Sequence, residues 1–427
     1  MKLIRTTGRG ARQTTKIIAA LENRGSAALE TVTPRVHRIV AEVRRHGDRA
    51  LLRFAARFDG MTDATKLRVS RGEMAAAWDR LDSALRRALS TAAAQIRGFA
   101  ERQMPSAWTM LPVVGLSTGQ LVRPLDAVGC YVPSGRHPLP STLLMTAIPA
   151  QVAGVPRVVM VSPRPADATL AAAHLLGVTE FYRVGGAHAI AALAYGTESI
   201  PRVDKIVGPG NLYVTAAKKL VAFDSSIDML AGPTEVVVTS DIGDPAFIAA
   251  DLVAQAEHDP EALAILVTTR EALAKAVIAE TRERARRNSV ARAALDRKGL
   301  AILAANLFEA HEITNLIGPE HLTVDTAADL EWVSNAGSVF VGPWSAQPMG
   351  DYISGPNHTL PTGGMARVRG GLSVNDFLKL ITVQEYSAPA LRSLKQPAIT
   401  LAEAEGLTRH AEAIRARFAD VSRRARG

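Results

Sequence analysis

Residues 180–222, EFYRVGGAHAIAALAYGTESIPRVDKIVGPGNLYVTAAKKLVA, hold the pattern that decides the fold. In this stretch the strand-like run 180–186 leads into the helical run 187–196, and the strand-like run 204–210 leads into a second helical run. A short β-branched run, RVVMVSP at 157–163, precedes them. Strands that alternate with helices at this spacing are typical of a parallel sheet flanked by helices. The middle of the chain is therefore predicted to be an α/β domain.

Two of the strand-to-helix joints in this region are rich in glycine, namely Gly185-Gly186 and Gly208-Pro209-Gly210. Such joints let backbone amides approach a phosphate at the N-terminus of a helix. A tight turn requires glycine equally often, and the second joint lacks the third glycine of the dinucleotide-binding fingerprint. Both interpretations stay open from these residues alone.

A second series of strand candidates lies further along the chain, at 235–240, 262–269, 299–307 and 337–344, separated by helical runs. Asp244 followed by Pro245 predicts the start of one of these helices, because Asp is a favoured N-cap and Pro is favoured at the first helical position. The residues before about 110 and after about 372 read mostly as helix. The predicted fold class is α/β, with two Rossmann-like, incomplete parallel-sheet domains and small helical elements at the N- and C-termini.

The composition narrows the class of protein. A chain of 427 residues is too long for one ordinary hydrophobic core, and its 47% hydrophobic content is that of a globular protein. No stretch reaches the roughly 18 uncharged apolar residues that cross a bilayer, and no secretory signal is recognisable. The single cysteine, Cys130, excludes an internal disulfide framework and a cysteine-rich zinc site. We expect a cytoplasmic protein without membrane contact, in which nitrogen and oxygen atoms hold any metal.

The net charge of +9 raises the question of a nucleic-acid partner. The excess Arg is spread over helical runs such as 282–299 and over the tail 417–427, and neither zinc-finger spacing nor an aromatic RNA-binding signature accompanies it. Solvated helix faces explain this charge best. We therefore expect no nucleic-acid partner, although a basic surface on an α/β fold is also what a non-catalytic nucleic-acid-binding protein would have.

The stretch QAEHD, at 255–259, places Gln255 and His258 three residues apart in a run that otherwise reads as a buried helix. On a helix the two side chains would lie on one face, one turn apart. A solvated polar edge, or a histidine bonded to a backbone carbonyl, explains this pair without any function. The alternative is a pair of metal ligands on one face of the helix.

Three further segments place a histidine near a carboxylate or an amide: Glu320 with His321, Asp351 and Asn357 with His358, and Glu405 with His410. Taken singly, they are explained by a helix start, a turn cap or a solvated helix face. Taken together with Gln255 and His258, they offer the oxygen and nitrogen ligands that suit zinc or a neighbouring transition metal. The sequence does not show whether these segments converge.

These segments resemble, in the same order along the chain, those of the histidinol dehydrogenase family. The resemblance covers nearly the whole chain, and it rests on VGCYVPSGRHPLPSTLLM (128–145), RVGGAHAIAALAYGTESIPRVDKIVGPGNLYV (183–214), IDMLAGPTE (227–235), DLVAQAEHDP (251–260), GPEHL (318–322), GDYISGPNH (350–358) and AEAEGLTRH (402–410).

The resemblance implies a role for each matching residue. Glu320 and His321 match the acid–base pair of the family. One Zn²⁺ per subunit would be held by Gln255, His258, Asp351 and His410. The substrate would contact these four ligands and His321, together with Thr234, His358 and Glu405. NAD would be bound by Tyr131, His188 and Asn211.

The implied activity is the zinc-dependent, four-electron oxidation of L-histidinol through L-histidinal to L-histidine with two NAD⁺, the last steps of histidine biosynthesis. The family includes relatives that oxidise other small polar alcohols, such as a sulfonated propanediol, so a paralogous NAD-dependent dehydrogenase is the alternative. The chain departs from the usual family pattern at His188, where Gln is usual, at Ser134, where Gly is usual, and at Thr234, where Ser is usual. The first two departures concern the implied cofactor region.

The resemblance also implies a domain organisation and a homodimer. We expect an N-terminal helical element at 1–24, a first α/β domain with most of the metal site at 25–130 plus 238–372, a second, NAD-binding α/β domain at 131–237, and a small C-terminal helical element at 373–427. By the same resemblance, the C-terminal residues of one subunit complete the site of its partner.

Overall fold

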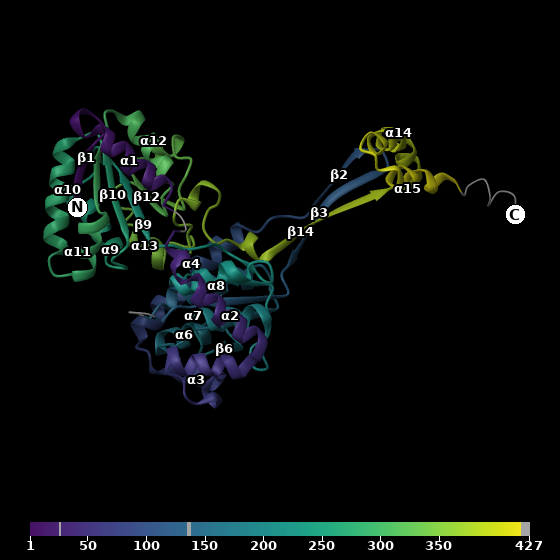
Figure 1. Ribbon diagram of the computed structural model, residues 1–427, viewed down its shortest axis with the longest axis horizontal. Coiled ribbons are helices and arrows are strands. Elements are labelled where there is room, and N and C mark those ends of the chain that lie inside the picture. Colours follow the sequence, from purple (N-terminus) through teal and green to yellow (C-terminus); the bar gives the residue numbers. More distant parts are fainter. Residues whose placement is uncertain (25–26, 135–137, 420–427) are drawn as a thin grey trace. The chain divides into compact units, whose positions relative to one another are not determined.

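The structure is a computed structural model that describes residues 1–24, 27–134 and 138–419. The chain divides into two compact units, drawn in Figure 1. The first comprises Met1–Met104 and Leu125–Phe377, and the second comprises Pro105–Pro124 and Leu378–Gly427. The predicted α/β class is confirmed, because the first unit contains two parallel sheets flanked by helices.

Sheet A has six parallel strands in the order β1-β11-β10-β9-β12-β13. Their bounds are β1 (Lys2–Arg5), β9 (Glu235–Thr239), β10 (Leu263–Thr268), β11 (Leu300–Leu303), β12 (His321–Val324) and β13 (Ser338–Val341). Around it lie α1 (Ala11–Glu22), α9 (Pro245–Ala256), α10 (Glu271–Ala285), α11 (Ser289–Lys298), α12 (Leu307–Ile317) and α13 (Pro348–Tyr352). Alternate residues of a strand face opposite sides, so Val236 and Val238 join one core cluster and Val237 joins another. A strand buried on both faces reads as a continuous apolar run, and this explains why β9 and β10 were recognisable in the sequence.

Sheet B has five parallel strands in the order β6-β5-β4-β7-β8. Their bounds are β4 (Ala127–Tyr131), β5 (Arg157–Val161), β6 (Glu180–Tyr182), β7 (Lys205–Val207) and β8 (Ser226–Ile227). The helices of this part are α2 (Ala27–Phe54), α3 (Arg71–Arg80), α4 (Ser83–Arg102), α5 (Pro140–Val152), α6 (Asp167–Leu175), α7 (Gly186–Tyr195) and α8 (Leu212–Val221). The strand order reverses between β4 and β7, and the crevice at the carboxyl ends of two such strands is where open α/β sheets bind ligands.

The carboxyl edge of sheet A is filled by its own polar side chains. Asp325, just after β12, accepts hydrogen bonds from the Ser240 hydroxyl at 2.5 Å and from the Asp241 amide at 2.9 Å. Asp241 in turn accepts hydrogen bonds from the Thr268 hydroxyl and the Thr269 amide, both at 2.7 Å. These carboxylates tie together the segments that follow β9, β10 and β12.

The second unit combines an antiparallel sheet with two helices. Its strands pair in the order β14-β3-β2, with the bounds β2 (Trp108–Val113), β3 (Leu116–Pro124) and β14 (Leu378–Tyr386). The helices are α14 (Ala388–Ala404) and α15 (Thr408–Ala419). The expectation that the residues after about 372 are mostly helical missed β14, whose partner strand β3 lies far away in the sequence.

The core around sheet B includes residues from the N-terminal region of the chain. Helix α2 buries Val36, Val40 and Leu51 in the cluster that also contains strand and helix residues of sheet B. The expected division had grouped 25–130 with 238–372, and its boundaries stay a prediction. Within the described residues, no helix has the length and apolar character needed to cross a membrane.

Candidate active site

Helix α9 ends within the stretch QAEHD. It begins as predicted, because Asp244 is the N-cap and its side chain accepts a hydrogen bond from the Ala246 amide at 2.7 Å. The helix ends at Ala256, since Asp259 precedes Pro260 and the residue before a proline disfavours helical geometry. The expectation that Gln255 and His258 share a helix face was therefore wrong. Gln255 is buried in the last turn, and His258 is exposed in the turn that follows.

Glu320 and His321 lie at the amino edge of sheet A. His321 is the first residue of β12 and pairs with Val236 of β9, so both residues lie beside the start of β9. The Glu320 carboxylate accepts hydrogen bonds from the Thr234 hydroxyl at 2.6 Å and from the Glu235 amide at 2.7 Å. The His321 Nδ1 lies 3.1 Å from the Glu235 carbonyl oxygen, to which it donates, and this leaves Nε2 directed to other partners. Both side chains are buried.

Gln255 joins this group from α9. Its amide nitrogen donates a hydrogen bond to the Thr234 hydroxyl and lies 3.3 Å from the His321 Nδ1. Its buried amide oxygen, Oε1, has no hydrogen-bond partner among the described residues. An unsatisfied buried carbonyl oxygen is costly, and a bound cation would satisfy it. This atom therefore fits the role of a metal ligand.

Asp351 and His358 approach the same histidine from the segment after β13. Asp351, on α13, places one carboxylate oxygen 3.7 Å from the His321 Nε2. Its other oxygen accepts a hydrogen bond from the side-chain amide nitrogen of Gln347 at 3.3 Å. The His358 Nδ1 lies 2.8 Å from the Asp351 carbonyl oxygen, and its Nε2 lies 3.2 Å from the Thr142 hydroxyl. His358 is thus held by hydrogen bonds at both ring nitrogens.

The charges of the site oppose the effect of burial. Burial lowers the pKa of His321, but the charge of Glu320 and the hydrogen bond with Asp351 outweigh it and raise this pKa to about 10. Burial opposes ionisation of Asp351, yet the neighbouring histidines, including His258, hold the pKa of this carboxyl below its usual value. Burial lowers the pKa of His358. The site therefore pairs one strongly basic imidazole with two carboxylates.

A cavity of about 440 Å³ opens onto this cluster, and its lining includes His321, His358, Phe340, Trp344 and Met349. A volume of this size accommodates a small polar molecule. Within the described residues, no group of three or more His, Cys, Asp or Glu side chains is arranged to hold a metal ion. Of the expected ligands, Gln255, His258 and Asp351 belong to the first unit and His410 belongs to the second.

Glu405 and His410 belong to the second unit. Glu405 follows the end of α14, His410 lies in the first turn of α15, and both side chains are exposed. The residues that the hydrogen bonds and ion pairs bring together within the first unit are Thr234, Gln255, Glu320, His321, Asp351 and His358.

The expected cofactor residues lie at the carboxyl edge of sheet B. The hydroxyl of Tyr131, at the end of β4, accepts a hydrogen bond from the Gly186 amide at 3.1 Å, and burial raises the pKa of Tyr131 to about 12. The Nε2 of His188, in α7, lies 2.8 Å from a carboxylate oxygen of Asp59. Asn211 is the N-cap of α8 and accepts hydrogen bonds from two backbone amides. These positions agree with the expected place of a ligand in an open α/β sheet.

The glycine at position 208 is required by the close approach of two strands. Its φ is +110°, and a Cβ there would lie 2.2 Å from the carbonyl oxygen of Tyr131. Gly208 thus lets the turn after β7 lie against the end of β4. The tight-turn interpretation of this joint is sufficient to explain its glycine.

Several residues of the site were not found from the sequence, namely Arg24, Thr142, Glu235 and Gln347. Arg24, Thr142 and Glu235 contact the site through hydrogen bonds that join segments far apart in the chain. Gln347 contacts Asp351, four residues further along the chain. The side chains of Thr142 and Gln347 are uncharged, so nothing in the sequence marks these two residues as candidates. A charged residue at the first position of a buried strand, such as Glu235, was the one signal available in the sequence, because buried charges need partners.

The chain is similar to known proteins over nearly its whole length. A sequence model of the family described as histidinol dehydrogenase matches residues 22–418. A histidinol dehydrogenase of Methanothermobacter thermautotrophicus is 46% identical over 94% of this chain and 97% of that protein, and one of Geobacillus kaustophilus is 48% identical over 89% and 92%. The crystal structure of a histidinol dehydrogenase from Elizabethkingia anophelis superimposes with a TM-score of 0.91 at 33% identity, covering 99% of both chains. The chain therefore belongs to the histidinol dehydrogenase family of NAD-dependent oxidoreductases.

Proposed function

We propose that this chain oxidises L-histidinol through L-histidinal to L-histidine and reduces two NAD⁺. The observation that carries the proposal is the position of His321, which is buried between Glu320 and Asp351 and beside the unsatisfied oxygen of Gln255. In a member of this family, this cluster joins an acid–base pair to atoms that fit a metal.

In the first step His321 takes the proton of the primary alcohol, and the carbon transfers a hydride to NAD⁺, which gives the aldehyde. The bond between Nδ1 and the Glu235 carbonyl leaves Nε2 to act as the acceptor. A cation held by Asp351 would withdraw one of the two carboxylates that raise the pKa of His321. The pKa would then fall, and more of the imidazole would be unprotonated and free to accept the alcohol proton.

In the second step a water adds to the aldehyde, and the hydrate transfers a second hydride to NAD⁺ and leaves as a carboxylate. Glu320 supports this step, because the two hydrogen bonds from residues 234 and 235 both go to its Oε2. The other oxygen, Oε1, accepts no hydrogen bond that the described residues show, so it is available to take a proton from water.

We propose that one Zn²⁺ per subunit is bound by Gln255, His258, Asp351 and His410. Bound zinc would hold the substrate's amine and imidazole nitrogens and thereby orient the alcohol toward His321. The residues that would assist in binding the substrate are Thr234, His358 and Glu405.

We propose that Tyr131, His188 and Asn211 bind NAD at the carboxyl edge of sheet B. His188 stands where the family usually has Gln, and it is nine-tenths or more buried against Asp59. Its Nδ1 is buried and has no partner among the described residues, so one ring nitrogen is left for the cofactor.

The activity is tested by following NADH formation with L-histidinol in the purified protein. We expect two NADH per histidinol, loss of the activity after chelation and recovery after addition of Zn²⁺. A panel of amino and sulfonated alcohols provides the control. The proposal is contradicted if histidinol is not oxidised at any metal loading, or if another alcohol of the panel has a much larger kcat/KM.

We propose further that the protein acts in the cytoplasm as a homodimer, in which Glu405 and His410 complete the site of the partner subunit. Mixing an inactive His321→Asn variant with an inactive His410→Asn variant is expected to restore about a quarter of the wild-type rate. Half of the dimers are then mixed, and each mixed dimer has one intact site. If the mixture stays inactive although subunits exchange, His410 acts within its own subunit.

A further inference from the structure

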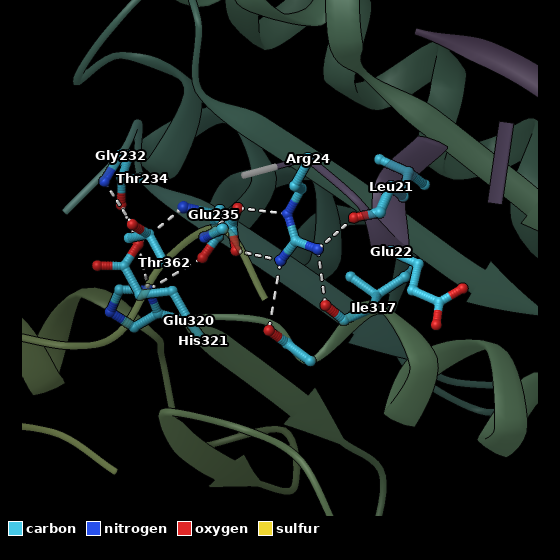
Figure 2. Close-up of polar contacts among 12 residues, drawn as sticks. Leu21, Glu22, Arg24, Gly232, Thr234, Glu235, Ile317, Glu320, His321 and Thr362 are labelled. Carbon is cyan, nitrogen blue, oxygen red and sulfur yellow. Dashed lines mark hydrogen bonds and ion pairs between the residues drawn. The ribbon is translucent and has the colours of Figure 1, made fainter. Parts of the chain in front are cut away.

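We propose that the buried ion pair between Arg24 and Glu235 is a positioning device for the acid–base pair Glu320 and His321. This inference rests on the proposed function and concerns residues to which no role was assigned from the sequence. Figure 2 shows Glu235 between the Arg24 side chain on one side and Thr234, Glu320 and His321 on the other.

The Arg24–Glu235 contact is bidentate and shielded from water. The Nε of Arg24 lies 2.5 Å from one carboxylate oxygen of Glu235, and one terminal nitrogen lies 2.6 Å from the other. The side chains are 13% and 5% exposed, respectively. Planar guanidinium and carboxylate groups paired in this way fix distance and orientation together.

The remaining hydrogen bonds of the pair anchor it to three separate segments. Arg24 donates to the backbone carbonyls of Leu21, at the end of α1, and of Ile317, at the end of α12, at 2.5 and 2.7 Å. The Glu235 carboxylate also accepts a hydrogen bond from the Gly363 amide at 3.0 Å. The pair therefore fixes the first residue of β9 against its surroundings.

The backbone amide and carbonyl of Glu235 form hydrogen bonds with the proposed acid–base pair. The Glu235 amide donates to the Glu320 carboxylate at 2.7 Å, and the Glu235 carbonyl accepts from the His321 Nδ1 at 3.1 Å. The amide nitrogen of Gln255 lies 3.4 Å from the same carbonyl. A displacement of residue 235 would thus move the acid, the base and a proposed metal ligand together.

The free-energy cost of burying two charges indicates that the pair has a positioning role and not a stabilising one. Taking two charges out of water costs several kcal/mol per ion, so a buried pair is weak evidence for a gain in stability. Such a pair does fix a geometry, and a displacement of about 1 Å in a catalytic constellation lowers rates by about a hundredfold. The hydrogen bond to Nδ1 also holds the proton on that nitrogen and leaves Nε2 as the acceptor.

The test compares Glu235→Gln and Arg24→Lys with the wild type. Both variants keep the size of the side chain and lose the bidentate charge pair. We expect kcat to fall by about 10- to 100-fold with L-histidinol and also with L-histidinal at saturating Zn²⁺, while KM changes little. The matched control is Glu271→Gln, which breaks a bidentate pair with Arg5 on the same sheet that is 40% and 42% exposed. This control is expected to keep the wild-type kcat.

A neutral pair separates positioning from stability. Arg24→Met combined with Glu235→Gln removes both buried charges, and its free energy of unfolding is expected to recover relative to the single variants. If the pair has a positioning role, kcat stays low in this double variant. A kcat that recovers along with the stability would overturn the inference, and so would an unchanged kcat in a folded Arg24→Lys variant.

A second measurement requires no substrate, so it distinguishes failure of this inference from failure of the proposed function. With ¹⁵N-labelled histidine, the Nδ1 proton of His321 is expected to give a slowly exchanging signal, which His321→Asn assigns by its absence. In Glu235→Gln and Arg24→Lys this proton is expected to exchange faster. Equal exchange in the wild type and both variants would overturn the inference whether or not histidinol is oxidised.

Discussion

Replacing His321 with Asn is expected to lower kcat for L-histidinol about a thousandfold while the zinc content stays that of the wild type. The side chain of Asn can still donate to the Glu235 carbonyl, so the start of β9 keeps its contact. The ring nitrogen that faces Asp351 at 3.7 Å is lost, and with it the proposed acceptor of the alcohol proton. The measurement combines steady-state kinetics with metal analysis of the same preparation.

The control for this variant is another histidine near sheet A. His311 of α12 stacks on Trp332, with ring centroids 4.2 Å apart, and it contacts none of the site residues described above. His311→Asn is expected to keep the wild-type kcat. Equal loss of zinc from the His321 and His258 variants would show that the division into a base and a ligand is wrong.

Replacing His258 with Asn is expected to lower the affinity for Zn²⁺ by more than about a hundredfold, because removal of a ligand exceeds the 10- to 100-fold effect of removing a residue that only supports one. The imidazole of His258 is exposed in the turn after α9, so the fold does not depend on it. We therefore expect the metal-free variant and the metal-free wild type to unfold at the same temperature. Only the wild type should then be stabilised by micromolar Zn²⁺.

Titration calorimetry and thermal unfolding with and without Zn²⁺ test this result. The neighbouring Glu257 is exposed and its side chain accepts a hydrogen bond from Asn288, away from the site, so Glu257→Gln is the matched control. A His258→Asn variant that binds zinc as the wild type does would remove His258 from the ligand set.

The α/β class was predictable from the sequence because its central strands are buried on both faces. Continuous apolar runs such as those of β9 and β10 follow directly from this burial. The strands β1 and β14 were missed for a different reason. Strand β1 has only four residues and β14 is exposed along most of its length. Each is held by a strand distant in the sequence, with β1 pairing to β11 and β14 to β3. Such pairing leaves no local pattern to recognise.

The types of residue in the candidate site could be predicted from the sequence. The residues that hold them in place could not. Histidine and carboxylate in GPEHL and GDYISGPNH stand out because such residues are costly to bury without partners. The helix end at Ala256 was missed, although Pro260 indicated that the helix had to stop nearby. The ion pair of Arg24 with Glu235 arises only in the folded chain, because more than two hundred residues separate the two in the sequence. Hydrogen bonds of this kind have no signature in the sequence.

The closed carboxyl edge of sheet A has a consequence for the order of events. The carboxylates of Asp325 and Asp241 accept hydrogen bonds from hydroxyls and amides there, and the residues proposed to bind NAD lie at the carboxyl edge of sheet B instead. If that is the one NAD site of each subunit, the two NAD⁺ of the proposed reaction would bind there one after the other. The aldehyde intermediate would then have to stay bound while NADH dissociates and a second NAD⁺ binds. Its residence time on the enzyme would therefore have to exceed that of NADH. The dissociation rate of the aldehyde, and not the rate of hydride transfer, would then determine how much L-histidinal is released into solution.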